Sequence, residues 1–186
     1  MTDWTVRDYD PADERSWLRC RVLAFLDTNY YDDVVTAKPP RDAGLELVAV
    51  AGDQVIGLLD ASVNGTESTI ETIAVHPDHR RLGVAQRLLN EITDRLQTRG
   101  ATQVDAWTRD DEGTLAWCRT QGFEQAMRYL HVYASTPDEA RAAFASPLNL
   151  TPRAAFFHAW PDQEDALRNQ FTRVHSCRQL IKPLSP

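Results

Sequence analysis

An apolar stripe at helical spacing is the clearest pattern in the chain. Its residues are Ala85, Leu88, Leu89, Ile92 and Leu96. Positions i, i+4, i+7 and i+11 fall on one side of an α-helix, and polar residues such as Gln86 and Asp94 occupy the other side. The pattern therefore predicts an amphipathic helix that begins at Val84 and ends at Gly100, since glycine commonly follows the last turn of a helix.

A second helix is predicted near the start of the chain, after a short strand. Residues Trp4 to Arg7 alternate between apolar and polar, as in a strand. Asp10 and Pro11 then supply an N-cap and a first helical position. Apolar residues recur at helical spacing at Leu18, Val22, Phe25 and Leu26. Residues Asp27 to Arg41 are polar and irregular, and they predict a loop with room for a short helix.

Three antiparallel strands are predicted to follow in succession. Leu45 to Ala51 and Gln54 to Val63 are apolar and rich in β-branched residues, and Gly52-Asp53 joins them as in a hairpin. Asn64-Gly65 is a second turn signal before the strand Thr69 to Val75. That strand must end near Pro77, because proline donates no hydrogen bond to the ladder.

The later elements alternate between strand and helix. They are a strand at Val104 to Thr108, a short helix at Thr114 to Gln121, a strand at Arg128 to Ala134, a proline-rich link, an apolar run at Ala154 to Ala159, a helix near Asp162 to Phe171 and a strand at Ser176 to Lys182. This order predicts an α/β (α+β) fold with a mixed, mostly antiparallel sheet of six to seven strands and helices on both faces.

Length, charge and cysteine content limit the class of protein that this chain can belong to. The 186 residues predict one domain, with residues 135–186 as an extension that completes it. The net charge of −7 disfavours a nucleic acid or an anionic membrane as a partner and fits a cationic substrate better. No apolar run is long enough to span a membrane, and the start of the chain lacks a signal-peptide pattern, so we expect a cytoplasmic protein. Three cysteines that lie far apart indicate neither a disulfide framework nor a metal site.

The turn between the predicted strand Thr69 to Val75 and the helix at Val84 is the segment that most clearly indicates a binding site. The first N–H groups of a helix have no partner within it and point toward a site that favours anions. Gly83 leaves room for a phosphate to approach the backbone, and Ala85 keeps the next turn small. Arg80 and Arg81 add positive charge. A diphosphate is the anion that best fills such a turn.

These residues resemble a known family, the GNAT superfamily of acyl-CoA N-acetyltransferases. Its best-known motif has Arg or Gln, two residues, Gly, one residue, then Gly or Ala, after a strand that ends in Val-x-Pro; here those positions are Arg80, Gly83 and Ala85. The Gly52-Asp53 hairpin and the helix end Trp117 to Phe123 extend the resemblance, which covers about residues 4–134 and the last strand.

The resemblance implies acetyl-CoA as cosubstrate, with no metal. Residues 1–134 would then form the acetyl-CoA-binding N-acetyltransferase core. The turn amides would hold the coenzyme pyrophosphate, and the preceding strand would pair with the pantetheine arm. The coenzyme-binding residues would be Ile73, Ala74, Val75, Arg80, Arg81, Leu82, Gly83, Val84 and Ala85.

Acetyl transfer to an amine needs a base that accepts the proton of the ammonium group. Glu71 is the candidate, because the resemblance places a carboxylate here and strand alternation places Glu71 on the same face as Ile73 and Val75. The alternative is an ordinary solvated strand glutamate. His76 and His79 fit polar turn residues better than catalytic ones.

The leaving thiolate is commonly protonated in this family by a tyrosine, and this chain has Cys118 at that position. Cys118 could donate the proton or could be a buried structural residue. Tyr129 or Tyr133 could replace it, or the thiolate could leave unaided. The family's nearby asparagine is replaced by Asp110 or Asp111, which puts the coenzyme contact from that loop in doubt.

The acceptor side of the site is expected in the segment Asp27 to Asp33. Tyr30, Tyr31 and Asp32 combine rings with negative charge, which suits a cationic amine; a solvated helix start is the alternative. The function that follows is transfer of an acetyl group to a primary amine of a small molecule or peptide, by direct attack in a ternary complex. A non-catalytic acyl-CoA-binding module and an acyltransferase with a longer acyl chain or a hydroxyl acceptor are the other hypotheses. Aromatic residues near the C-terminus also permit a homodimer contact.

Overall fold

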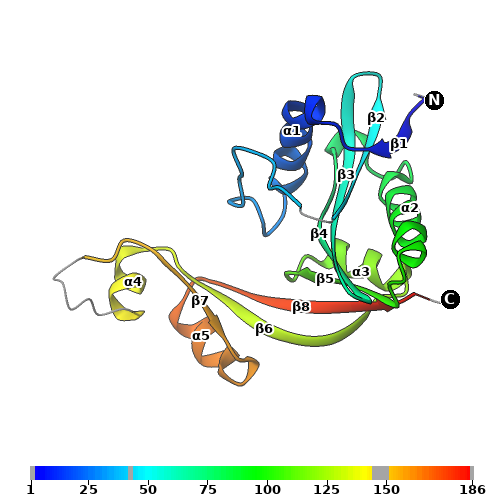
Figure 1. Ribbon diagram of the computed structural model, residues 1–186. Coiled ribbons are helices and arrows are strands. Elements are labelled where there is room, and N and C mark those ends of the chain that lie inside the picture. The colour runs from blue at the N-terminus through cyan, green and yellow to red at the C-terminus, as the bar shows by residue number, and fades with distance from the viewer. Residues whose placement is uncertain (1–2, 42–43, 144–150, 185–186) are drawn as a thin grey trace. The chain divides into compact units, whose positions relative to one another are not determined.

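The computed structural model describes residues 3–41, 44–143 and 151–184, which belong to two compact units. The first unit contains the chain up to Ala106 together with its end from Ile181. The second unit runs from Trp107 to Leu180. Each unit has its own strands and helices (Figure 1). The predicted division of the chain at residue 134 stays a prediction.

The first unit is built on a sheet in the order β1-β2-β3-β4-β5. Its strands are β1 (Thr5–Asp8), β2 (Leu45–Ala51), β3 (Gln54–Asn64), β4 (Glu67–Val75) and β5 (Gln103–Thr108), of which the residues from Trp107 belong to the second unit. The pairs from β1 to β4 are antiparallel, and β4 and β5 are parallel. The predicted hairpin and the strand that follows it are confirmed.

Two helices of the first unit, α1 (Glu14–Phe25) and α2 (Val84–Thr98), lie on opposite sides of β2, β3 and β4 (Figure 1). Leu58 packs in a core with Trp17 of α1. The neighbouring Gly57 faces α2, and a Cβ atom there would come 2.5 Å from Val84 Cγ1, so only glycine fits. Successive strand residues thus serve opposite helices.

The predicted start of the first helix is confirmed in detail. The Asp10 side chain accepts a hydrogen bond from the Ala12 N–H at 2.9 Å, and a one-turn 3₁₀ helix, Pro11–Asp13, leads into α1. Residues 27–41 form turns and extended chain rather than a second helix.

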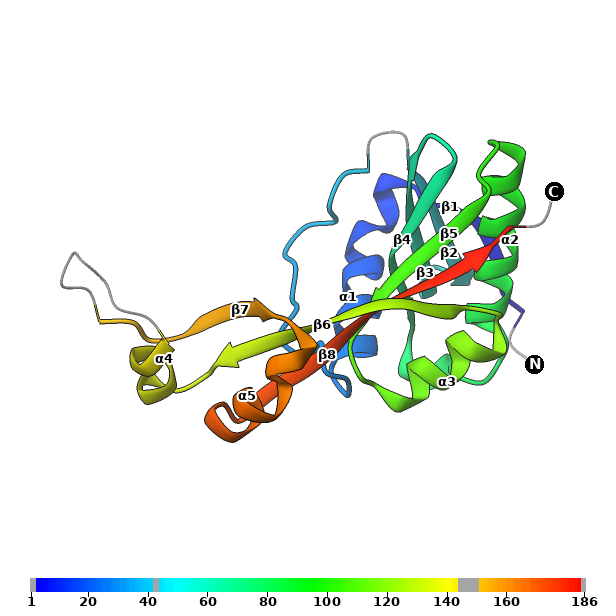
Figure 2. The same cartoon turned by 90° about the horizontal axis from the view of Figure 1, so that it is seen from below.

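The second unit contains α3 (Glu112–Thr120), β6 (Glu124–Ala134), α4 (Pro137–Ala143), β7 (Ala155–Ala159), α5 (Glu164–Gln170) and most of β8 (Arg173–Pro183). Its strands are ordered β8-β6-β7, and β6 runs antiparallel to β7 (Figure 2). Leu130 and Val132 of β6 form a core with Ala140 of α4 and Leu167 of α5, so these two helices cover one face.

The predicted fold class is confirmed: the fold is mixed α/β, with mostly antiparallel strands and helices on both faces of the sheet in the first unit. The strand count differs, because the described residues contain eight strands. The apolar run near Ala154 is β7, and α4 lies where a proline-rich link was predicted.

Candidate functional site

The loop between β4 and α2 has a backbone shape suited to an anion. Arg81 has φ 62° and is the one non-glycine residue with positive φ in the described part of the chain, and Gly83 follows with φ 79°. The first hydrogen bond of α2 runs from the Arg87 N–H to the Gly83 carbonyl at 3.0 Å. The N–H groups of Val84, Ala85 and Gln86 therefore have no partner within the helix.

The space in front of this loop is open. A Cβ atom built on Gly83 would meet no atom within 4 Å, and no side chain caps the start of α2. Leu82 is 54% exposed at the tip of the loop. Free amides, a positive helix end and room for an oxyanion coincide here, so the residues present fit a diphosphate group.

The two arginines of the loop differ in their surroundings. The Arg80 guanidinium donates from Nη2 to the carbonyl of Ala24, near the end of α1, at 2.9 Å. Arg80 therefore ties the loop to a helix C-terminus, where a cation is favoured. Arg81 is exposed beside the open space.

A β-bulge moves Glu71 away from the face predicted for it. Thr72 pairs with Asp60, and Ile70 pairs with Ala61, so Glu71 has no partner opposite it. Its carboxylate instead accepts a hydrogen bond from Ser62, which by alternation lies on the face opposite Ile73. The prediction that Glu71 shares a face with Ile73 and Val75 is wrong, because the extra residue breaks the alternation.

The Glu71 carboxylate is held from two sides. Ser62 Oγ donates to Oε1 at 2.7 Å, and Arg41 Nη1 lies 3.9 Å from Oε2. The Glu71 side chain is 33% exposed, so a solvated amine could reach it. Fixed orientation and partial exposure are both useful in a proton acceptor.

A buried cluster of charged residues lies on the same face of the sheet as Ser62 and Glu71. The sequence analysis did not predict this cluster. Lys38 forms ion pairs with Glu46 and with Asp60, the latter at 3.3 Å. Its ammonium also lies 4.6 Å from the ring centre of Tyr9 and 5.3 Å from that of Trp17. Lys38 comes from the loop after α1, so the cluster anchors that loop to β2 and β3.

Burial raises the pKa of Asp60 to about 6, although the charges of Lys38 and Arg41 act in the opposite direction. Both carboxylate oxygens are buried without a hydrogen bond of ordinary geometry. The sequence marks each residue as unusual, since Asp60 interrupts an apolar strand and Lys38 is one of two lysines in the chain, but it does not show that the two residues pair.

The predicted acceptor residues lie in the turns after α1. Tyr30 packs at 5.7 Å, between ring centres, against Phe25, whereas Tyr31 is 51% exposed. Arg21 donates to the Asp33 carbonyl at 2.6 Å and to its carboxylate at 2.8 Å. This bidentate contact fixes the segment that contains Asp32, so both rings and carboxylates stand near the end of α1.

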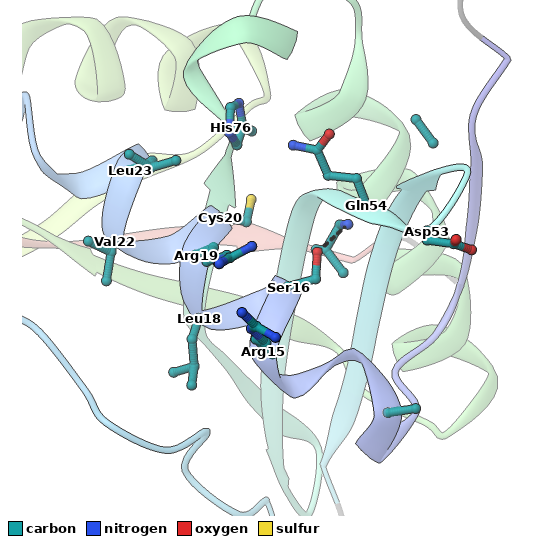
Figure 3. A pocket seen from close by; sticks show the side chains of 13 residues that line it. Arg15, Ser16, Leu18, Arg19, Cys20, Val22, Leu23, Asp53, Gln54 and His76 are labelled. Carbon is teal, nitrogen blue, oxygen red and sulfur yellow. Dashed lines mark hydrogen bonds between the residues drawn. The ribbon is translucent and has the colours of Figure 1, made fainter.

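An open groove of about 1090 Å³ lies along α1 in the first unit. Figure 3 shows Arg15 and Arg19 on successive turns of α1, Gln54 on the β2–β3 hairpin and His76 beyond them. His76 directly precedes the loop that leads to α2, so the groove adjoins that loop. Cys20 lies at its base, and burial raises the pKa of that thiol to about 12.

The three predicted proton donors, Cys118, Tyr129 and Tyr133, belong to the second unit. Cys118 is 5% exposed, and burial raises its pKa to about 11. The Tyr129 hydroxyl lies 3.0 Å from His131 Nε2 and also hydrogen-bonds to the Cys177 thiol. Arg109 Nε donates to His131 Nδ1 at 3.2 Å, which leaves the proton of the neutral imidazole on Nε2, facing Tyr129.

The motif, the loop geometry and the fold together define the class of this protein. The sequence profile of the acetyltransferase (GNAT) family matches residues 2–123, and the chain belongs to this family. The predicted family is confirmed, and the predicted acyltransferase class is that of the family. A curated relative, Acetyltransferase SG1711 of Sodalis glossinidius (strain morsitans), is 28% identical over 95 residues, which span 51% of this chain and 66% of that relative.

Solved structures of low identity share the fold. The ribosomal-protein-S18-alanine N-acetyltransferase of Escherichia coli matches with a TM-score of 0.64 and 15% identity, covering 99% of this chain and 96% of that one. A GNAT family acetyltransferase from Elizabethkingia anophelis with acetyl-CoA bound matches with a TM-score of 0.55 and 14% identity, covering 99% and 100%. Within the described residues, no helix is long and apolar enough to cross a membrane.

Proposed function

We propose that the protein transfers the acetyl group of acetyl-CoA to a primary amine of a small molecule or peptide. The observation that carries this proposal is the loop from Arg81 to Ala85, where amides without helical partners surround the open space at Gly83. These amides would hold the coenzyme pyrophosphate, and residues 73–75 of β4 would lie beside the pantetheine arm. The exposed Arg81 would add positive charge.

Acetyl-CoA supplies an activated acyl group when it is bound. Glu71 accepts the proton of the acceptor ammonium, directly or through water, and Ser62 and Arg41 hold the carboxylate in place. The neutral nitrogen would then bond to the acyl carbon as the carbon–sulfur bond breaks, in a single ternary complex, and would release its second proton to solvent or to the departing thiolate. Tyr30, Tyr31 and Asp32 would line the acceptor side.

Cys118 is a poor candidate for the group that protonates the departing thiolate. A thiol with a pKa of about 11 is a poor proton donor to a thiolate whose own acid has an ordinary pKa of about 8.5. We therefore favour release of the thiolate to solvent, with Tyr129 as the alternative donor.

An amine panel with thiol detection tests the transferase. The proposal expects free coenzyme A thiol to appear only with acetyl-CoA and an amine together, and expects Glu71→Gln to reduce its rate. Coenzyme binding without thiol release for any amine would favour the second candidate, a non-catalytic acyl-CoA-binding module; the burial of Cys118 at the usual tyrosine position is the observation behind it. Cytoplasmic location and a homodimer stay predictions.

A further inference from the structure

The second unit has an aromatic sheet face opposite the face that α4 and α5 cover. Strand alternation sends Leu130 and Val132 into the core with α4 and α5, so Tyr129, His131 and Tyr133 point to the other face. The β6–β7 register pairs His131 with His158 and Tyr133 with Phe156. Imidazole, phenol and phenyl rings therefore share one surface.

These rings form a continuous ladder. His131 stacks on His158 with ring centres 5.1 Å apart and planes 8° apart. Tyr129 meets His158 edge-on at 4.6 Å and Trp107 edge-on at 5.5 Å. Edge contacts of this kind hold rings in fixed orientations, so the ladder is a preformed surface.

A pocket of about 330 Å³ opens at the Trp107 end of the ladder. Its lining residues, all in the second unit, are Trp107, Met127, Tyr129, His158, Ala159 and Trp160. Trp160 is 63% exposed, Met127 41% and Trp107 38%. Large apolar side chains exposed together are uncommon on a surface without a binding role, and the volume falls in the range of small-molecule sites.

The charged groups near the pocket disfavour a positively charged ligand. No lining residue is Asp, Glu, Lys or Arg. Behind the rings, the Arg109 guanidinium is 7% exposed and donates to His131, and Arg173 lies 3.9 Å from the ring centre of Tyr133. Burial and the Arg109 charge lower the pKa of His131 to about 4. The carboxylate of Asp110, the residue after Arg109, is engaged by His175 at 3.0 Å and by Arg168 at 3.8 Å.

We propose that this pocket binds a small molecule through an aromatic ring that carries no positive charge. The ring would lie between Trp107 and Trp160, against the edge of Tyr129, and the Met127 thioether would adapt to its outline. A negatively charged substituent is favoured by Arg109, because its guanidinium donates to His131, which stacks on the lining residue His158. The site does not depend on coenzyme binding.

Three ligands that share the indole ring test the proposal: indole, indole-3-propionate and tryptamine. Each is titrated calorimetrically into the full chain without coenzyme. We expect indole-3-propionate to bind at least as tightly as indole, and tryptamine to bind about tenfold more weakly than indole-3-propionate. Trp160→Ala should weaken binding of the first two about tenfold, because it removes one wall at an exposed position.

Leu26→Ala is the matched control, since Leu26 is 59% exposed on the first unit, outside the pocket. It should leave all three affinities unchanged. Absence of binding for indole and indole-3-propionate in the folded protein would overturn the proposal. Tightest binding of tryptamine would also overturn it, and would identify a cation-binding cage instead. Equal affinities in wild type and Trp160→Ala would place any bound ring elsewhere.

Discussion

Replacing Gly83 with alanine separates backbone strain from loss of the coenzyme site. Gly83 has φ 79°, and a Cβ atom there would meet nothing within 4 Å. The cost to folding is thus the strain of a left-handed alanine, about 1 kcal/mol. For a protein of this size that corresponds to a fall in melting temperature of about 2–4 °C.

The same methyl group would project into the open space where a pyrophosphate oxygen would approach the amides. We therefore expect Gly83→Ala to weaken acetyl-CoA binding about tenfold or more, because several charge-assisted hydrogen bonds would lengthen together. Gly65→Ala is the matched control: Gly65 has φ 62°, is also free of neighbours within 4 Å, and lies in the β3–β4 turn.

Thermal unfolding and calorimetric titration of the two variants give the comparison. Both variants should lose similar stability, and only Gly83→Ala should lose coenzyme affinity. If Gly83→Ala binds acetyl-CoA as tightly as Gly65→Ala does, the loop does not hold the pyrophosphate.

Three further predictions concern titratable groups. Glu71→Gln should lower turnover most at low pH, where the acceptor is most protonated, and should leave acetyl-CoA affinity nearly unchanged; wild-type rates across the pH range would remove Glu71 as the base. The pKa of Asp60 is raised to about 6 from 3.8, so the folded state holds this proton more tightly and its contribution to the free energy of unfolding should fall by about 3 kcal/mol as pH rises from about 4 to about 6. Denaturant unfolding should therefore show a steeper decline over that interval in wild type than in Asp60→Asn, and parallel curves would contradict the assignment. Cys118→Ser should keep turnover within about twofold, because the buried thiol stays protonated near neutral pH; a loss of about a hundredfold in a folded variant would make Cys118 the proton donor.

The sequence pattern placed most of the fold, because each helix buries one side and the strands are apolar or alternating runs bounded by turn residues. The apolar stripe predicted α2 from Val84, and Gly52-Asp53 predicted the β2–β3 hairpin. The helix α4 was missed, although Thr136 and Glu139 form a capping box: the Glu139 N–H bonds Thr136 Oγ, and the Glu139 carboxylate accepts from the Thr136 N–H. Because α4 is short and begins with a proline, the sequence pattern predicted a proline-rich link there instead.

The surroundings of the proposed base were harder to predict from the sequence than the coenzyme-binding loop. Alternation cannot reveal an inserted bulge residue, so it assigned Glu71 to the wrong face. The contact between Lys38 and Asp60 joins residues that are distant along the chain. The pattern of a single sequence does not reveal which distant residues pair. The loop at Gly83 was predictable because its chemistry depends on adjacent residues of one turn.

Calorimetric titration of the full chain with acetyl-CoA, with ATP as the comparison ligand, tests the central claim most directly. We expect micromolar binding of acetyl-CoA and no binding of ATP. Absence of binding to acetyl-CoA and to free coenzyme A, in protein shown to be folded by circular dichroism, would mean that the loop from Arg81 to Ala85 only begins a helix, and would contradict the account.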